Sequence, residues 1–515
     1  MNRWSAPALL LILAGALALR VPKLATRPLH NDEAVNAVKV SELWQHGRYA
    51  YDPDEYHGPT LHYATLPFLW SSGARNSDEL EDATLRLAPV AFGVGLILLL
   101  LLFVNGLGRP AVAWAALFIA ISPAMVFYSR YFIHEMPLLF FTALTLGAGW
   151  RYSQTRAARW AVAAGAGLGL MFATKETFVI NLAAMGLAGI VTAWWAMPSP
   201  RRVPSLRTIC DWKHAALALG TTLAAWLLLF SSCFTHFAGL LDSARTYLPW
   251  LKRAGGHSPH IHPWSFYLER LAWFHPAKGP AWSEGLILVL AVTGAAVSLV
   301  GKKTPLHRFL ALYTILLTAA YCAISYKTPW CLLNFYLGMI LLAGVGAAAL
   351  VESCRARAIK SVTVVVLAGL TLQLAWQAWR ASFVYSADRR NPYVYAQTAP
   401  DLLHLVRRAE AIARVAPAGL ETLVKVIAPD SDYWPLPWYL RRFQHLGWYE
   451  ALPDDPFAPI VVVASKLDAR LDEKSGRKWI MAGLSELRPG KFFELYVELE
   501  LWKKYVETLP RDHDE

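Results

Sequence analysis

Apolar stretches long enough to cross a lipid bilayer recur through the first three-quarters of the chain. A membrane-spanning helix needs about 20 predominantly apolar residues. The pattern predicts eleven spanning helices, at residues 6–20, 87–105, 111–127, 136–150, 159–174, 178–196, 214–231, 283–300, 307–324, 331–351 and 359–378. The first could be mistaken for a secretory signal, but no convincing small-x-small cleavage site precedes Arg20. We therefore expect it to be retained as a signal anchor.

The hydrophobic period changes in the C-terminal region. The runs "TLVKVIAP" and "PIVVVAS" are short, β-branched and bounded by Pro, Asp and Ser, which is typical of strands. Segments with helical patterning and charged faces lie on either side of them. The sequence thus predicts an α-helical polytopic membrane domain over residues 1–380, with long outer loops at 21–86 and 232–282. A small α/β extracytoplasmic domain is expected over residues 385–515.

Composition and charge support this class. The chain has 515 residues, 56% hydrophobic, with 22 tryptophans and a mean hydropathy of +0.33. Its net charge of +12 comes with Lys and Arg clusters in every second loop, a pattern that marks cytoplasmic loops. The clusters are Arg109; Arg151, Arg156 and Arg159; Arg201, Arg202, Arg207 and Lys213; Lys302, Lys303 and Arg308; and Arg355, Arg357 and Lys360. They predict a multi-pass protein of the cytoplasmic (inner) membrane, with the N-terminus inside and the C-terminal domain outside. The absence of a long basic run argues against nucleic-acid binding.

Two adjacent carboxylates, Asp32 and Glu33, follow the first span in "RPLHNDEAVNA". Carboxylates are costly beside a bilayer unless they face water or a functional site. One interpretation is a catalytic base with a neighbour that orients substrate or shifts its pKa. The other is a helix N-cap with first-turn charges, since residues from Asn31 onward have the pattern of a surface helix. A second surface helix is expected to begin at Pro59.

Three short outer turns carry charged residues. "SRYFIHEMP" contains Arg130, His134 and Glu135; "ATKET" contains Lys175 and Glu176; and "SYKTPW" contains Tyr326 and Lys327. Each turn by itself could be a helix cap at the membrane surface, with the long cation reaching for water. Because all three lie on the same side as Asp32 and each presents a cation, they suggest an outward pocket for a membrane-embedded anion such as a lipid phosphate.

The second outer loop contains His257, His260 and His262. Clustered histidines can bind a metal, but no carboxylate or cysteine completes a recognised spacing, so substrate contact or interfacial structure is favoured. The five cysteines show no CxxC spacing and indicate neither a disulfide framework nor a zinc site. In "DSDYWPLPWYLRRF", the rings of Trp434, Trp438 and Tyr439 could stack on a sugar, although packing is the simpler interpretation.

A first span followed by an outer loop that opens with "HNDEA" resembles the GT-C superfamily of integral-membrane glycosyltransferases, which includes protein O-mannosyltransferases and the aminoarabinose transferase acting on lipid A. "SRYFIHEMPLL" resembles their second acidic motif and "GLMFATKET" their lysine turn. More narrowly, "YDPDEYHGPTLHY", "ATKET", "GHSPHIHPW", "SYKTPWCLL" and "YWPLPWYLR" are similar to the flippase-activity-associated family of archaeal-type N-glycosylation. The resemblance covers nearly the whole chain.

This resemblance implies an enzyme that moves a sugar from a polyprenyl-phosphate donor to an acceptor hydroxyl of a lipid, glycan or protein, with inversion at the anomeric carbon. Asp32 would be the base, Glu33 would orient Asp32 or the sugar, and Glu135 would be the second carboxylate. The implied substrate-binding residues are Arg130, His134, Lys175, Glu176, Lys327, Tyr326, His57, His260 and His262. Many relatives have Asp where this chain has Glu135, so a requirement for Mg²⁺ or Mn²⁺ stays open.

Two other functions compete with sugar transfer. Translocation of a lipid-linked sugar is suggested by the name of the narrower family, but it would call for charges deep inside the spans, where this chain has few. A non-catalytic membrane scaffold would need the C-terminal domain and not the charged turns. We expect the transferase.

Overall fold

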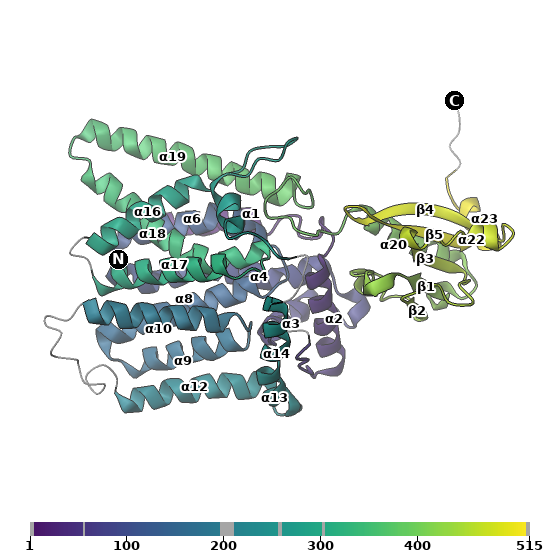
Figure 1. Cartoon of the computed structure of the whole chain (residues 1–515), viewed down its shortest axis with the longest axis horizontal. Coiled ribbons are helices and arrows are strands. Elements are labelled where there is room, and N and C mark those ends of the chain that lie inside the picture. Colours follow the sequence, from purple (N-terminus) through teal and green to yellow (C-terminus); the bar gives the residue numbers. More distant parts are fainter. Residues whose placement is uncertain (1–4, 55–56, 196–210, 256–259, 301–303, 511–515) are drawn as a thin grey trace. The chain divides into compact units, whose positions relative to one another are not determined.

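The computed structural model describes residues 5–54, 57–195, 211–255, 260–300 and 304–510 (Figure 1). The chain forms two compact units. The first contains Met1–Leu24, Glu42–Gly73 and Ala83–Tyr395, and the second contains Ala25–Ser41, Ala74–Asp82 and Ala396–Glu515. Two pieces of the first outer loop thus belong with the C-terminal region. Six residues named in the sequence predictions lie outside the described residues: Arg201, Arg202, Arg207, His257, Lys302 and Lys303.

Long apolar helices make up most of the first unit. They are α1 (Ser5–Arg20), α4 (Asp82–Leu99, continued by η2, Leu100–Phe103, and α5, Val104–Leu107), α6 (Arg109–Ile121), α7 (Pro123–Tyr128), α8 (Glu135–Thr155), α9 (Ala158–Phe172), α10 (Phe178–Trp195), α12 (Trp212–Phe230), α16 (Gly285–Val300), α17 (Pro305–Ala323), α18 (Leu333–Ser353) and α19 (Arg357–Trp379). Each predicted span falls on this set. Among the described residues, six helices are long and apolar enough to cross a membrane and four more are shorter apolar helices. The number of spans stays a prediction.

Shorter helices connect the long ones. They are α2 (Asn31–His46), α3 (Thr60–Ser72), α13 (Ala238–Arg245), α14 (Tyr247–Gly255), α15 (Phe266–Ala272), η1 (Ser77–Glu79), η3 (Pro329–Leu332) and the π-helical turn η4 (Arg380–Val384). Helices α2 and α3 correspond to the two surface helices expected in the first outer loop. The division between the two units falls within α2, after Ser41.

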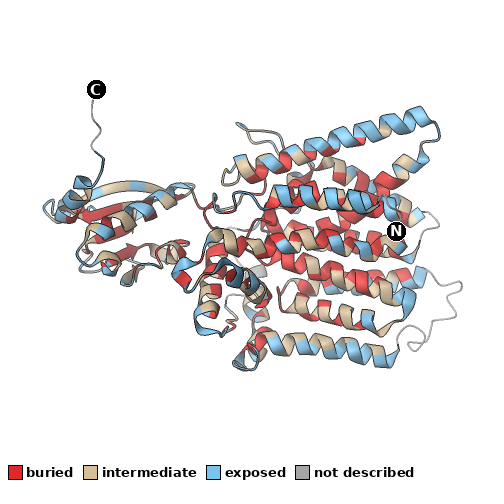
Figure 2. Cartoon of the chain, turned by 180° about the vertical axis from the view of Figure 1, so that it is seen from behind, coloured by how far each residue is buried: buried red, intermediate tan, exposed pale blue. Residues whose placement is uncertain are grey.

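Burial in the first unit follows a membrane pattern (Figure 2). Helix α18 is almost wholly buried, whereas α12 and α19 turn most of their apolar residues outward. Exposed apolar side chains on α19 include Val362, Val365 and Leu372, each more than 60% exposed. An apolar surface of this extent is typical of a face that contacts lipid.

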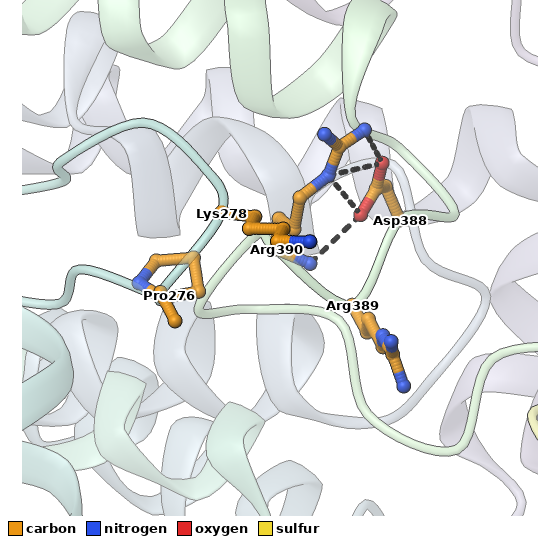
Figure 3. Close-up of a pocket in the computed structure, with 6 residues that line it drawn as sticks. Pro276, Lys278, Asp388, Arg389 and Arg390 are labelled. Carbon is orange, nitrogen blue, oxygen red and sulfur yellow. Dashed lines mark hydrogen bonds and ion pairs between the residues drawn. The ribbon is translucent and has the colours of Figure 1, made fainter.

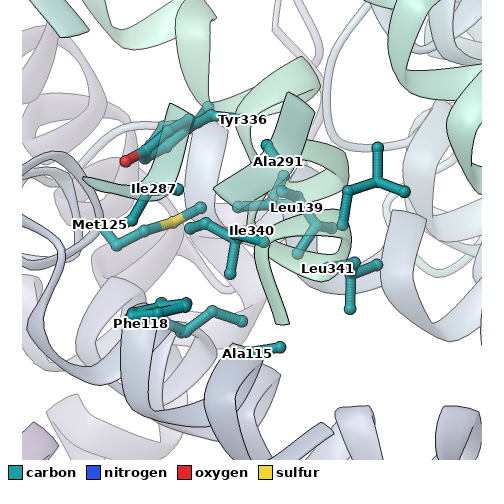
Figure 4. Close-up of a cluster of buried hydrophobic side chains, with 14 of the residues drawn as sticks. Ala115, Phe118, Met125, Leu139, Ile287, Ala291, Tyr336, Ile340 and Leu341 are labelled. Carbon is teal, nitrogen blue, oxygen red and sulfur yellow. The ribbon is translucent and has the colours of Figure 1, made fainter. Parts of the chain in front are cut away.

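The main core surrounds α18. Phe118 of α6, Met125 of α7, Leu139 of α8 and Ile287 of α16 belong to one buried cluster with Ile340 of α18 (Figure 4). Helices α16 and α18 cross closely because glycine faces backbone at the crossing. A Cβ on Gly294 would lie 1.9 Å from the carbonyl oxygen of Leu342, and one on Gly346 would lie 2.0 Å from that of Leu290. Small residues at such crossings let helices in a membrane approach.

A buried carboxylate ties this core together. Glu284 is fully buried just before α16. It accepts hydrogen bonds from the hydroxyls of Ser122, Tyr336 and Tyr393, each at 2.6 Å, and from the amide of Ala124 at 2.9 Å. Ser122 and Ala124 lie where α6 meets α7, Tyr336 lies on α18, and Tyr393 follows α19. The Glu284 carboxylate therefore links three segments that are distant from it in sequence.

The second unit contains a five-stranded mixed sheet in the order β2-β1-β3-β5-β4. The strands are β1 (Val424–Ile427), β2 (Leu446–Tyr449), β3 (Ile460–Ala464), β4 (Trp479–Arg488) and β5 (Lys491–Glu498). β1 pairs in parallel with β2 and β3, while β5 pairs antiparallel with β3 and β4. The accompanying helices are α20 (Asp401–Val415), α21 (Leu436–Tyr439), α22 (Leu471–Lys474) and α23 (Leu499–Glu507), with 3-10 turns η5 (Gly419–Glu421), η6 (Pro429–Ser431) and η7 (Ser465–Leu467). The prediction of a small C-terminal α/β region is confirmed.

Candidate functional site

The turn between α9 and α10 carries a lysine that is almost completely buried. Nζ of Lys175 is bonded to Oε1 of Glu135, at the start of α8, and their side chains are 7% and 1% exposed. Burial alone would lower the pKa of Lys175, yet the Glu135 carboxylate outweighs it and the pKa of the lysine is raised. Lys175 is therefore a permanent cation whose nearest counter-charge comes from the neighbouring helix.

The first outer loop contacts this turn between α9 and α10. Nδ1 of His57 is 3.0 Å from Oε2 of Glu176, and His57 and Lys175 form an isolated antiparallel bridge. The amide of Gly58 donates to the carbonyl of Thr174 at 3.1 Å. A Cβ on Gly58 would lie 2.1 Å from the carbonyl oxygen of Ala173, so only glycine allows this approach. The structure thereby brings His57, Lys175, Glu176 and Glu135 together.

His134 lies beneath this loop, fully buried at the N-cap of α8. Its ring centroid is 4.9 Å from that of His57 and 5.5 Å from that of His62. Nε2 is 3.1 Å from the carbonyl oxygen of Gly58, so this nitrogen carries the proton and donates it. Nδ1 has no hydrogen-bond partner within the described part of the chain. Burial, followed by the neighbouring histidines and Lys175, lowers the pKa of His134 well below its ordinary value, so the ring is neutral.

The turn between α17 and α18 places a second lysine. Lys327 is 1% exposed, and its Nζ donates to the carbonyls of Ile324 and, at 3.2 Å, His262. Its amide donates to the carbonyl of His260 at 2.8 Å, and Tyr326 pairs with Ile261 in an isolated bridge. No carboxylate pairs with Lys327 among the described residues, and burial lowers its pKa. The structure therefore brings together Tyr326 and Lys327 of one loop with His260 and His262 of another, which the sequence had treated separately.

A tyrosine that the sequence did not single out joins the two histidines of this cluster. The hydroxyl of Tyr395 is 2.7 Å from Nδ1 of His260 and 3.0 Å from Nε2 of His262. A phenol has one proton to donate. One imidazole therefore accepts from Tyr395, and the other donates its N–H to the phenol oxygen. The three side chains form a short hydrogen-bonded chain beside Lys327.

Arg270, on α15, is the second residue that sequence reasoning missed. Its guanidinium lies 3.5 Å from the ring centroid of Phe266, which stacks on His262 with centroids 4.1 Å apart. Nη1 donates to the carbonyl of Phe266, whereas Nε is buried with no partner in the described ranges. Burial, and then the charges of Arg270 and Lys327 among others, lowers the pKa of His262. Two cations thus flank one histidine without a described carboxylate between them.

The two lysine turns are close neighbours in the bundle. The side chain of Asn181, on the first turn of α10, donates to that of Asn334 on α18 at 3.2 Å, and Tyr313 of α17 donates to Asn181 at 2.9 Å. These bonds fix the helix starts that follow Lys175 and Lys327. The two lysine turns thus lie at the same end of the helix bundle, as expected for turns on one side of the membrane.

Arg130 occupies a different setting from the lysines. Its guanidinium donates to the carbonyls of Arg20, Pro22 and Lys23 at 2.7, 2.8 and 3.2 Å, and it lies 4.5 Å from the ring centroid of Phe383. In this arrangement it caps the C-terminal end of α1. Its expected contact with a phosphate stays a prediction.

Asp32 and Glu33 belong to the second unit and have different environments. The side chain of Glu33 is fully buried, accepting from Arg27 at 3.1 Å and from the amide of His30 at 2.9 Å. It closes the start of α2 as a capping residue. The side chain of Asp32 is 39% exposed and lies 3.7 Å from Nδ1 of His30. That nitrogen accepts the Asp32 amide, and burial lowers the pKa of His30, so the histidine is neutral and the Asp32 carboxylate is not ion-paired with it.

Metal ligands are not grouped in the ranges that the structure describes: no set of three or more His, Cys, Asp or Glu side chains could hold an ion there. The three clustered histidines, His57, His62 and His134, each face a ring or a carbonyl rather than one common point. Within the described residues, therefore, no side-chain cluster fits Mg²⁺ or Mn²⁺.

Comparisons with known proteins address the fold. Residues 61–240, about a third of the chain, match the family model described as dolichyl-phosphate-mannose-protein mannosyltransferase. The structure of ArnT from Cupriavidus metallidurans bound to undecaprenyl phosphate superposes with a TM-score of 0.59 at 16% identity, covering 94% of this chain and 97% of that one. An Archaeoglobus fulgidus oligosaccharyltransferase tethered with an acceptor peptide gives 0.55 at 13% identity, covering 88% and 64%. No curated protein matches. The chain has the GT-C fold.

The similar structures confirm the fold expected from the resemblance. The stretch that matches the mannosyltransferase model agrees with the expected class, a membrane glycosyltransferase, which is proposed below. The matched stretch contains Arg130, Glu135 and Lys175 but neither Asp32 nor Lys327. The roles of these residues, and the narrower flippase-associated family, stay predictions.

The first unit also contains a cavity of about 700 Å³ (Figure 3). It is lined by Pro276, Ala277, Lys278, Asp388, Arg389 and Arg390. The Arg390 guanidinium is held by Asp388 through a bond from Nε of 2.9 Å and one from Nη2 of 2.5 Å. None of the expected site residues lines this cavity, so it is not part of the candidate site.

Proposed function

We propose that the protein is an inverting glycosyltransferase that moves a sugar from a polyprenyl-phosphate donor to an acceptor hydroxyl on the extracytoplasmic face of the inner membrane. The observation that carries the proposal is the pair of cations, Lys327 and Arg270, that flank His262, neither of them in an ion pair with a carboxylate of the described residues. They lie in a unit with the GT-C fold, next to the helix starts that follow Lys175.

Buried cations without counter-charges favour an anionic ligand. Removing a cation from water is costly unless an opposite charge and hydrogen bonds replace the lost hydration. Lys327 has carbonyls around its Nζ and Arg270 retains a buried, unbonded Nε. Neither forms an ion pair with a carboxylate in the described structure, although the charge of the exposed Glu269 acts on Arg270. Lysine and arginine both suit phosphate oxygens, the first as a point charge and the second through its planar fork.

Charge development makes this pair useful in catalysis. A polyprenyl-phosphate sugar is a phosphodiester with one negative charge. When the bond between the anomeric carbon and the phosphate oxygen breaks, the electron pair stays on that oxygen and a phosphomonoester leaves with additional charge. Lys327 and Arg270 therefore bind the departing phosphate more strongly than the donor, which is the condition for accelerating the step.

The acceptor requires a base, and Asp32 has the exposure for this role. In the proposed step its carboxylate takes the proton of the acceptor hydroxyl while the acceptor oxygen bonds to the anomeric carbon. Attack from the side opposite to the leaving phosphate inverts the configuration. Glu33 acts on Asp32 indirectly, by fixing the start of α2. Glu135 holds Lys175, and His57 with Glu176 fixes the adjoining loop for donor binding.

The similar structures support the choice of ligands. ArnT was solved with undecaprenyl phosphate and the oligosaccharyltransferase with an acceptor peptide, so the fold accepts both a polyprenyl phosphate and an extended acceptor. The positive loops predicted from the sequence place the N-terminus inside and the charged turns outside. Donor sugar and acceptor are left to experiment.

The test is transfer by the purified chain in lipid nanodiscs supplied with a panel of radiolabelled polyprenyl-phosphate sugars and membrane-extracted acceptors. We expect release of polyprenyl phosphate together with labelled product, reduced about 100-fold or more in Lys327→Met and Arg270→Met. Lys503→Met, on the exposed face of α23, is the matched control and should keep full activity. If the label stays on the lipid but crosses the bilayer of sealed vesicles, the protein is a translocator and the proposal fails.

A further inference from the structure

We propose that the aromatic segment Tyr433–Arg441 of the second unit is a positioning element for Asp32, acting through the hydroxyl of Tyr439. This inference rests on the proposed function, because it assigns Asp32 as the base. The C-terminal region would then contribute to sugar transfer by positioning the base, without touching the substrate.

The hydroxyl of Tyr439 connects two distant segments. It accepts a hydrogen bond from the backbone amide of Leu29 at 2.7 Å and donates to Oδ2 of Asp82 at 2.7 Å. The direction is fixed, since an amide can only donate and the phenol proton then goes to the carboxylate. Leu29 precedes Asp32 by three residues. The bond therefore holds the chain directly before the helix on which Asp32 lies.

Asp82 is held in turn by the neighbouring tryptophan. Nε1 of Trp438 donates to Oδ1 of Asp82 at 2.7 Å, so the two carboxylate oxygens are bound by consecutive residues of α21. Trp438 is fully buried, and the Arg441 guanidinium lies 3.7 Å from its ring centroid. Arg441 also donates to the carbonyls of Ser77 and Leu80. Trp438 therefore has no face open to stack on a sugar, and its contacts instead fix α21 against Asp82 and the segment that contains Ser77 and Leu80.

A second set of bonds holds the same loop from the other side. Gln397 accepts from Arg27 at 3.1 Å and donates to the carbonyl of Pro28 at 3.0 Å. Thr398 donates to the carbonyl of Leu29 at 2.7 Å. Arg27 passes the restraint onward to Glu33, the capping residue of α2. The backbone on both sides of Leu29 is thereby fixed before α2 begins.

Asp32 is the one carboxylate at this helix start that stays accessible. Glu33 is buried and bonded, whereas the Asp32 side chain is 39% exposed. A base must lie within about 3 Å of the proton that it removes, and a misplacement of about 1 Å can lower turnover about 100-fold. The bonds made by Tyr439 to the loop before α2 explain how Asp32, at the start of that helix, keeps a fixed position.

The experiment uses the full chain in nanodiscs and the variant Tyr439→Phe, which keeps the ring and removes only the hydroxyl. Tyr496→Phe is the matched control, because Tyr496 likewise donates to a carboxylate of the second unit, Glu494 at 3.0 Å, but contacts neither the loop nor α21. We expect Tyr439→Phe to lower kcat about 10- to 100-fold with donor KM changed less than twofold. Its melting temperature should match that of Tyr496→Phe.

The background of Asp32→Asn separates positioning from general stability. If Tyr439 acts through Asp32, Tyr439→Phe adds no further loss to the residual rate of Asp32→Asn, since effects of residues that act as a unit are not additive. Equal kcat for Tyr439→Phe and Tyr496→Phe, or a multiplicative loss in the double variant, would overturn the inference and leave the proposed function standing. Full activity of Asp32→Asn itself would instead remove the proposed function.

Discussion

Nδ1 of His57 lies 3.0 Å from the carboxylate of Glu176, which joins the first outer loop to the turn between α9 and α10. Glu176 is 5% exposed on its side chain, and His57 is 31% exposed. The carboxylate fixes the histidine ring and, with the backbone contacts of Gly58, the path of the loop.

We expect Glu176→Gln and His57→Gln each to raise the donor KM about 5- to 10-fold, because a charge-assisted bond is replaced by a weaker neutral one or lost. The double variant should be no worse than either single variant. Steady-state kinetics with varied donor checks this. Glu352→Gln, which removes an exposed carboxylate at the end of α18, serves as control. Multiplicative effects in the double variant would show that the two residues act separately.

The ion pair of Glu135 and Lys175 predicts an asymmetric response of stability. Lys175→Met leaves the Glu135 carboxylate buried without its partner and should lower the free energy of unfolding by about 3–5 kcal/mol. Adding Glu135→Leu should restore most of the stability without restoring activity. The measurement is thermal unfolding in detergent, in which the fraction of protein that stays monodisperse is recorded as temperature rises. A single variant as stable as the unmodified protein would contradict the buried pair.

Stability should fall on acidification because buried His134 and His30 are neutral in the folded chain. Burial lowers the pKa of both, so the unfolded chain binds more protons below its ordinary histidine pKa of about 6.5. The stability that these neutral histidines contribute is therefore complete above about pH 6.5, and the free energy of unfolding decreases as pH falls toward 5. Melting temperatures of the protein and of His134→Gln across this range test the sign. The variant should lose part of the slope, whereas His445→Gln should keep it; equal slopes in all three would be contrary evidence.

The sequence predicted the fold well where hydrophobic period decides the structure. Turns that end apolar stretches placed Lys175 and Lys327 correctly, because the ends of spanning helices follow directly from chain length and polarity. The sequence left two interpretations of Asp32 and Glu33 open, a catalytic pair or a helix start with first-turn charges. The buried bonds of Glu33 to Arg27 and His30 place Glu33 at a helix start, as the second interpretation expected.

Other residues could not be found in this way because their partners are remote in sequence. Glu284 reads as the edge of an apolar stretch, and its donors come from residues 122, 124, 336 and 393. Arg270 is surrounded by aromatic residues, and its only local signal is the spacing of four from Phe266. Tyr439 and Asp82 lie 357 residues apart, so no local pattern could link them.

The central claim is that Asp32 removes the acceptor proton during sugar transfer from a polyprenyl phosphate. The most direct measurement is single-turnover transfer in nanodiscs by Asp32→Asn beside Asp78→Asn, which removes an exposed carboxylate from the same unit. We predict that Asp32→Asn folds and binds donor as the unmodified chain does but transfers sugar at least 100-fold more slowly, and that Asp78→Asn is unaffected. Transfer at the unmodified rate by Asp32→Asn would contradict the account.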